Sequence, residues 1–190
     1  GTGVVSLPYH HPLMVADRII QLDHQTRGRA MFGFGPGFLV SDARMMGIDP
    51  LTTRDRMVES LEVILRLLDG ETVTHDGSWF TLREASLHIA PYTMPRPHIS
   101  VTSARTPNGA KTAGRLGLGL LCVSAGSPDG YDVLDTNWAI ATETAAQHGR
   151  AMSRDDLRLI ASFHLAETRE EAHANVQYGF GKWMRYLETL

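Results

Sequence analysis

The stretch HISVTSARTPNGAKTAGRLGLGLLCVSA, residues 98–125, contains one complete strand–helix–strand unit. Residues 117–125 form a near-continuous apolar run that predicts a buried strand, and residues 98–103 predict another. Between them, Pro107 to Arg115 predict a helix. Apolar strands that are joined through helices are typical of a parallel sheet with helices packed on it.

The same alternation runs along the whole chain. The other predicted strands are residues 2–7, 29–34 and 157–166, and the other predicted helices are residues 13–25, 54–69, 129–148 and 168–189. The fold class is therefore α/β, either an open doubly wound sheet or a (β/α)8 barrel. Five strands are too few to close a barrel, and the chain opens on a strand and ends within a helix. We therefore expect a piece of a longer protein.

Helical spacing predicts which side chains face the core. In the helix at 13–25, Leu22 is expected on the apolar face and Asp23 away from it. In the helix at 54–69, Glu62 and Arg66 are spaced as an i,i+4 ion pair, and Gly70 is expected to end the helix.

The helical period is interrupted twice. Residues 36–53 predict a long loop or a short helical insertion, and 71–97 predict a hairpin with its turn at Asp76-Gly77. We expect this hairpin to be inserted in a βα loop of a single domain covering residues 1–190. Both segments are expected to wall the substrate side and to contribute to an oligomer.

Composition excludes several classes of protein. The net charge is −3 and the pI about 6.3, with charges scattered along the chain, which argues against nucleic-acid binding and a polybasic membrane patch. No apolar run approaches the roughly 18–20 residues that span a bilayer, and the first residues do not form a signal peptide. The single cysteine, Cys122, lies in an apolar run and is expected to be buried and unreactive, which favours a cytoplasmic location.

Gly33, Gly35 and Gly37 follow the strand at 29–34. Their spacing, G-x-G-x-G with Pro36 inside it and no helix directly after, argues against a dinucleotide-binding fingerprint. Two interpretations remain, namely close approach of the backbone to a ligand, or tight packing at the rim of a barrel.

A phosphate site is predicted where the strand at 98–103 meets the next helix. Thr106 is expected as the N-cap and Pro107 as the first helical residue, so free backbone N–H groups would point toward an anion. Ser103, Arg105 and Thr106 would add side-chain donors. The alternative is an ordinary capped loop with a solvated arginine.

The histidines give little support for a metal site. His10 and His11 are adjacent and lack acidic partners, so no metal site is predicted there. His11 is expected either to line a pocket or to form a hydrogen bond within its loop. His164, on the last predicted strand, is expected to be a core residue.

The order of the motifs resembles a known family over essentially all 190 residues. VVSLPYHHP is followed by ADRIIQLDHQTRGR, FGFGPG, SDARMMGIDP and PRPHISVTSARTPNGAKTAGRLGLGLL. This order resembles the bacterial luciferase-like flavin-dependent monooxygenases, including the limonene- and alkane-monooxygenase-like members. The resemblance implies a (β/α)8 TIM barrel of the luciferase-like type, of which this chain would hold about strands 3 to 7.

The resemblance also implies a chemistry. Such enzymes react reduced FMN with O2 to form a C4a-peroxyflavin and oxygenate a small hydrophobic substrate. A separate NAD(P)H-dependent reductase supplies the flavin, and a homodimer or homotetramer is expected. An F420-dependent oxidoreductase of the same fold and a non-catalytic flavin-binding paralogue are the alternatives.

Several site residues follow from the resemblance alone. A non-prolyl cis peptide is expected around Thr2–Val4 against the flavin ring, with Thr2 and Gly3 binding the cofactor. His11 is expected near the isoalloxazine and is the candidate catalytic residue. Gly35 and Gly37 would stay small where the flavin lies flat.

The phosphate contacts also follow from the resemblance. Ser103 matches the phosphate-binding serine, with Thr102 before it and Thr106 after it. Pro36 stands where a relative has a phosphate-binding arginine, and Arg105 is the candidate to replace that contact. Asp42 matches the acidic residue of the following loop.

Overall fold

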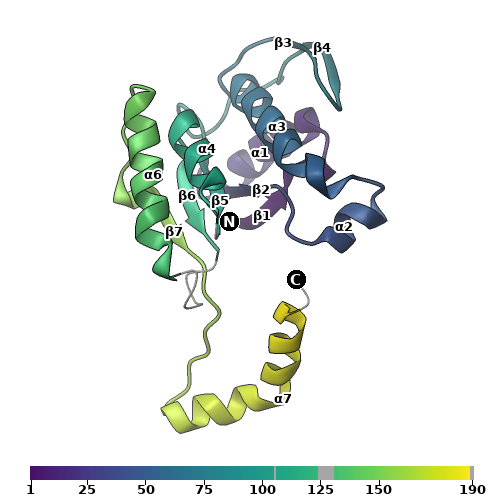
Figure 1. The fold of residues 1–190 in the computed structure, drawn as a ribbon. Coiled ribbons are helices and arrows are strands. Elements are labelled where there is room, and N and C mark those ends of the chain that lie inside the picture. The colour runs from purple at the N-terminus through teal and green to yellow at the C-terminus, as the bar shows by residue number, and fades with distance from the viewer. Residues whose placement is uncertain (105, 124–130, 189–190) are drawn as a thin grey trace.

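The sheet of this protein is parallel and has five strands. The computed structural model describes residues 1–104, 106–123 and 131–188. Its main sheet has the order β1-β2-β5-β6-β7, and every neighbouring pair is parallel (Figure 1). The strands are β1 (Thr2–Ser6), β2 (Met31–Gly35), β5 (His98–Ser103), β6 (Gly119–Cys122) and β7 (Leu157–Leu159). The predicted parallel α/β architecture is confirmed.

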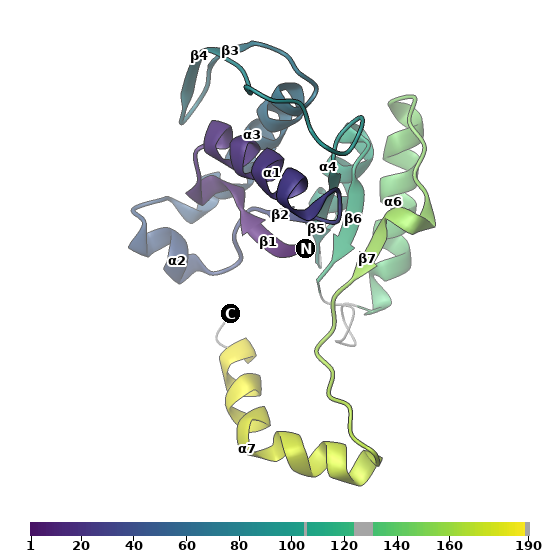
Figure 2. The same ribbon diagram turned by 180° about the vertical axis from the view of Figure 1, so that it is seen from behind.

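Four helices cover one face of this sheet. They are α1 (Pro12–Thr26), α3 (Thr53–Leu68), α4 (Asn108–Leu116) and α6 (Leu134–Gln147). Figure 1 and Figure 2 show α1 beside α3 and α4 beside α6. Alternate strand residues such as Phe34, Val101 and Leu120 are fully buried and share one core with these helices.

The residues between them point to the opposite face. These are Gly33, Gly35, Ser100, Thr102 and Leu121, none of which belongs to the core beneath the helices. No helix covers this inner face in the part of the chain that the structure describes (Figure 1). These residues therefore lie on the side of the sheet away from the four helices.

The predicted apolar face of α1 is partly wrong. Leu22 is 41% exposed, whereas Asp23 is completely buried. The Asp23 carboxylate accepts hydrogen bonds from the backbone N–H and the hydroxyl of Thr93, both at 2.8 Å. Because the proline-rich connector before β5 packs over the end of α1, it buries a carboxylate that helical spacing alone would leave in water.

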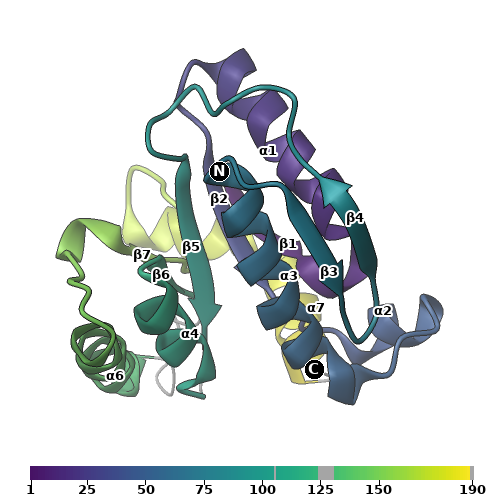
Figure 3. The same ribbon diagram turned by 90° about the horizontal axis from the view of Figure 1, so that it is seen from above.

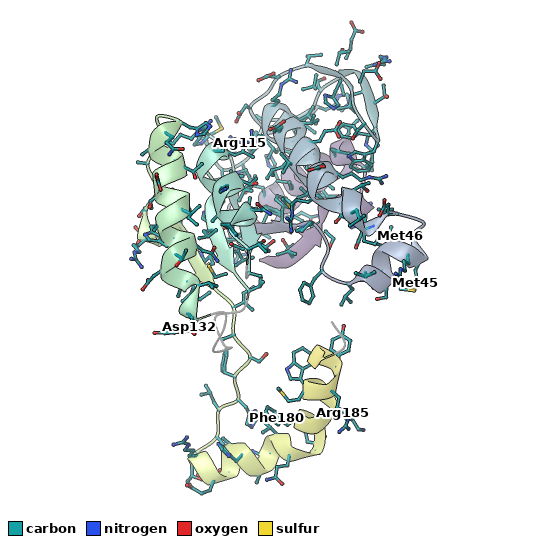
Figure 4. The ribbon with its side chains drawn as sticks, in the orientation of Figure 1. Met45, Met46, Arg115, Asp132, Phe180 and Arg185 are labelled. Carbon is teal, nitrogen blue, oxygen red and sulfur yellow. The ribbon has the colours of Figure 1, made fainter. Side chains whose placement is uncertain are left out.

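The end of α3 confirms one prediction and corrects another. Gly70 has φ +85° and donates to Leu67, while Glu71 donates to Arg66, as in a Schellman motif. Glu62 does not pair with Arg66; it accepts a 2.7 Å bond from Arg115 of α4, which Figure 4 labels. Glu62 therefore pairs with an arginine of the neighbouring helix α4 and not with Arg66 of its own helix.

The hairpin is confirmed, but its predicted position in the chain is wrong. β3 (Val73–Asp76) pairs antiparallel with β4 (Thr81–Ala85). The hairpin follows α3 and precedes β5, so it lies in an αβ connection and not in a βα loop. Figure 3 shows it running alongside α1 and α3, where it packs on the helical layer.

Glu59 of α3 fixes the tip of this hairpin. Its carboxylate accepts bonds from the Ser78 backbone N–H at 2.9 Å, the Ser78 hydroxyl at 2.6 Å and His75 Nε2 at 2.8 Å. Burial raises the pKa of Glu59, but the bonds from Ser78 and His75 outweigh burial, so the net pKa is lowered.

A Glu59→Gln variant should lose about 1–3 kcal/mol of unfolding free energy at pH 7, because charged hydrogen bonds are lost. Since the folded pKa lies below the unfolded value, this stabilisation is present above the unfolded pKa and disappears as pH falls through the folded pKa. Urea unfolding at pH 7 and at about pH 3 measures the difference. Glu84→Gln, an exposed change on the same hairpin, is the control. An equal loss at both pH values would contradict this account.

The carboxyl-terminal elements differ most from expectation. β7 has three residues instead of the predicted 157–166, and residues 161–165 are exposed, since β7 is the last strand of the described sheet. His164 is exposed, so its prediction as a core residue is wrong.

The last helix is α7 (Arg169–Glu188), which Figure 1 shows away from the sheet. Residues 129–130 of the predicted helix at 129–148 lie outside the described residues.

The insertion expected at 36–53 is confirmed, whereas the strand predicted at 117–125 is shorter: β6 covers Gly119–Cys122, and residues 124–125 lie outside the described ranges. The 36–53 segment forms α2 (Val40–Met45), a 3-10 turn η2 (Pro50–Thr52) and loops. Two further 3-10 turns are η1 (Leu7–Tyr9) and η3 (Arg154–Asp156).

Cys122 is buried, as predicted, and burial raises its pKa to about 11. Among the described helices, none has the length and apolar character that crossing a membrane requires.

Candidate functional site

The carboxyl ends of the strands meet at one edge of the sheet. Ser6 pairs with Gly35, and Ser103 pairs with Cys122. A Cβ built on Gly35 would lie 2.9 Å from the hydroxyl of Thr102 and 3.1 Å from Cγ2 of Val4. The structure thus brings the predicted residues Gly35 and Thr102 together and adds Val4, which the sequence named only as the end of the expected cis peptide segment.

The packing interpretation of the glycines has direct support. A Cβ on Gly33 would lie 2.6 Å from the Thr2 carbonyl oxygen and 2.8 Å from Cδ2 of Leu121. The neighbouring strands therefore require a glycine at this position whether or not a ligand is bound. Gly35 is also buried, and a Cβ there would crowd the side chains of Val4 and Thr102.

Gly37 is required by a different neighbour. It has φ +86°, and a Cβ there would collide with the hydroxyl of Tyr9. Burial, and secondly the nearby charge of Asp42 in α2, raise the pKa of Tyr9. The sequence drew attention to His10 and His11 in this loop but not to Tyr9, because nothing in its spacing connects Tyr9 with Gly37.

The predicted helix start is shifted by one residue. Pro107, not Thr106, is the N-cap of α4, and its carbonyl accepts from Lys111 at 2.9 Å. The prediction placed proline inside the first turn, but with ψ near 0° it precedes the first helical residue. Ser103 is buried and donates to the Thr106 carbonyl at 3.3 Å, so its hydroxyl proton already has an acceptor. Thr106 itself is exposed.

The first turn of α4 presents unpaired donors at this edge. The backbone N–H groups of Asn108, Gly109 and Ala110 have no acceptor among the described residues, and the first turn contains no acidic residue. Asn137 of α6 is buried and donates to the Ala104 carbonyl at 2.8 Å, which fixes the preceding loop. Arg105, the candidate phosphate ligand, lies outside the described residues.

Thr2 and Gly3 lie toward the other end of β1. The predicted non-prolyl cis peptide is present between Gly3 and Val4. The Thr2 hydroxyl accepts from the Gly33 N–H at 2.9 Å and donates to the Gly33 carbonyl at 3.1 Å. Thr2 and Gly3 line a hollow of about 240 Å³ on the inner face, with Ser100, Leu121 and Ile160 among its other walls. The structure therefore does not group Thr2 with Thr102 and Ser103.

His11 lies against the hairpin. It precedes the first residue of α1 and is exposed, and its ring meets the ring of Phe80 edge-on at 5.9 Å. The structure does not place its ring beside Thr102 or Ser103, and its catalytic role stays a prediction. No cluster of three or more potential metal ligands occurs within residues 1–104, 106–123 and 131–188.

The profile of the luciferase-like monooxygenase family matches residues 1–189. The chain belongs to this family. It is 48% identical to limonene 1,2-monooxygenase of Rhodococcus erythropolis and 46% identical to 4-hydroxyprotoasukamycin monooxygenase of Streptomyces nodosus subsp. asukaensis. These alignments cover 100% and 98% of this luciferase-like chain, but only 49% and 50% of the relatives. The chain thus spans about half the length of the curated relatives it matches.

Solved structures agree with an incomplete luciferase-like barrel. Monooxygenase RslO1 from Streptomyces bottropensis superposes with a TM-score of 0.87 at 26% identity, covering 98% of this chain and 56% of that one. The oxygenating constituent of 3,6-diketocamphane monooxygenase from Pseudomonas putida, in complex with FMN, shares the fold at a TM-score of 0.78 and 23% identity, covering 97% and 55%.

Proteins similar to this chain differ in the cofactor that their names state. An F420-dependent glucose-6-phosphate dehydrogenase of Beutenbergia cavernae is 29% identical over 84% of this chain and 47% of its own length. A curated relative is thus F420-dependent, whereas the 3,6-diketocamphane enzyme, which shares the fold, was solved with FMN.

Proposed function

We propose that this chain forms the cofactor-binding part of a monooxygenase that uses reduced FMN and O2 to oxygenate a small hydrophobic organic substrate. The observation that carries the proposal is the start of α4, whose first N–H groups have no acceptor among the described residues and lie at the carboxyl end of β5. The proposal is further supported by two relatives at 46–48% identity, both named monooxygenases.

The residues at this edge fit FMN. Unpaired N–H groups at a helix start favour a phosphate, and no carboxylate competes in the first turn of α4. Gly35 is itself buried, so a flat ring would lie against its partly exposed neighbours Val4 and Thr102. Reduced FMN, when bound, supplies the electrons that activate O2. The chain contributes binding, orientation and exclusion of water.

Exclusion of water and binding of an apolar substrate are assigned to the segment after β2. Phe38, Val40 and Met45 expose large apolar side chains there. Figure 4 shows Met45 and Met46 on the outer side of α2. Because flexible apolar side chains adapt to irregular surfaces, this segment suits the wall of a hydrophobic substrate site.

Isotope labelling separates the candidate activities. Under ¹⁸O2 with reduced FMN and a panel of cyclic hydrocarbons and ketones, we expect one ¹⁸O atom in the product, measured by mass spectrometry. Turnover with F420 and no incorporation of ¹⁸O would instead favour the F420-dependent oxidoreductase. Tight FMN binding without any product would favour the non-catalytic flavin-binding paralogue.

The proposal includes the partners that this chemistry needs. The enzyme would receive reduced FMN from a separate NAD(P)H-dependent flavin reductase in the cytoplasm. It would act as a homodimer or homotetramer, with the exposed 36–53 segment among the candidate contacts.

A further inference from the structure

The hydroxyl group of Tyr9 lies at the ends of β1 and β2 and has no hydrogen-bond partner among the described residues. It closes η1, directly after β1, and its hydroxyl lies against Gly37, two residues beyond β2. No residue in the described ranges forms a hydrogen bond with this hydroxyl, although the side chain is partly buried. The hydroxyl is therefore free to donate a hydrogen bond to an acceptor on a bound ligand.

The surroundings determine which kind of acceptor fits. Burial and the Asp42 carboxylate raise the pKa of Tyr9, so the phenol stays protonated and acts as a donor. The same carboxylate repels a second negative charge, which disfavours a phosphate or carboxylate as the acceptor. A neutral oxygen is therefore the favoured partner.

The Tyr9 hydroxyl lies at different strand ends from the proposed phosphate site. Tyr9 follows β1 and contacts the end of β2, whereas the free N–H groups of α4 follow β5. Phe38 and Val40, one and three residues after Gly37, expose apolar side chains on this side of the edge, beside the charge of Asp42. Apolar side chains with a few polar groups that fix orientation are the usual lining of a site for an organic molecule.

We propose that Tyr9 donates a hydrogen bond to a neutral oxygen of the organic substrate. The substrate class is then a mainly apolar molecule that carries a carbonyl, hydroxyl or ether oxygen. The identity of the ligand as a substrate rests on the proposed monooxygenase function, whereas the donor role of Tyr9 is measured by binding alone.

The test uses two ligands of nearly the same shape, cyclohexanone and methylenecyclohexane, which differ in the acceptor oxygen. Their affinities for the FMN-loaded protein are measured by ligand-observed NMR for the wild type, Tyr9→Phe and Tyr178→Phe, an exposed change on α7. We expect the wild type and Tyr178→Phe to prefer the ketone by about 3- to 10-fold, and Tyr9→Phe to lose this preference. FMN affinity should be unchanged in Tyr9→Phe.

Each outcome of this test either supports or overturns the proposed donor role of Tyr9. Loss of the ketone preference with unchanged FMN affinity supports the proposal, even where no oxygenated product forms, in which case only the proposed function fails. A ketone preference that survives in Tyr9→Phe overturns it, as does a wild type without any preference. Weaker FMN binding with unchanged ketone preference also overturns it, since the hydroxyl would then serve the flavin.

Discussion

A Gly109→Ala variant is expected to bind FMN about 100-fold more weakly than the wild type, a loss of about 2.7 kcal/mol. A Cβ on Gly109 would collide with the Thr102 carbonyl oxygen and lie 3.0 Å from Cα of Ser103. The start of α4 must then move away from the end of β5, and the donors of its first turn move with it. Alanine is a better helix former than glycine, so helix propensity does not cause the loss.

Gly114→Ala is the matched control within the same helix. A Cβ there would meet the Ala141 carbonyl oxygen and lie 2.9 Å from the Ala145 nitrogen, so the change separates α4 from α6. Both variants should lose about 1–3 kcal/mol of unfolding free energy through overpacking. Only Gly109→Ala should lose FMN affinity, measured by quenching of flavin fluorescence. Equal FMN affinities of the two variants would contradict the assignment of the phosphate site.

An Asp23→Ala variant is expected to lose about 3 kcal/mol of unfolding free energy, because it removes two hydrogen bonds to a fully buried carboxylate. The Thr93 N–H and hydroxyl would be left without their acceptor. For a chain of this length the melting temperature should fall by about 6–12 °C. Calorimetry and urea unfolding measure both quantities.

Asp17→Ala, an exposed change on the same helix, controls for the loss of a negative charge from α1. It should change the unfolding free energy by less than about 0.5 kcal/mol. If both variants lost the same amount, the bond between α1 and the proline-rich connector would contribute nothing to stability.

The sequence predicts the framework well because its signals are local. Apolar runs mark the strands, and Gly70 marks the end of α3 through its own backbone conformation. The errors in the pairing of Asp23 and Glu62 concern contacts that are distant in sequence. Thr93 reaches Asp23 across 70 positions, and Arg115 reaches Glu62 across 53. Helical spacing within one element contains no information about such partners.

In the candidate site, residues marked by sequence motifs were predicted, whereas contacts that only the folded chain creates were missed. Gly35 and Thr102 were predicted from the resemblance to the luciferase-like family, and the sheet brings these residues together. Tyr9 was missed because only the folded chain places its hydroxyl against Gly37. His11 was chosen from its motif, yet its ring lies against Phe80 of a hairpin whose position no spacing rule predicts.

The central claim is that the start of α4 holds the phosphate of FMN. Titration of the wild type and of Gly109→Ala with FMN and with riboflavin, which lacks the phosphate, tests it directly. The account predicts that the wild type binds FMN at least about 10-fold more tightly than riboflavin, and that Gly109→Ala loses this difference. Equal affinities of the wild type for FMN and riboflavin would contradict it.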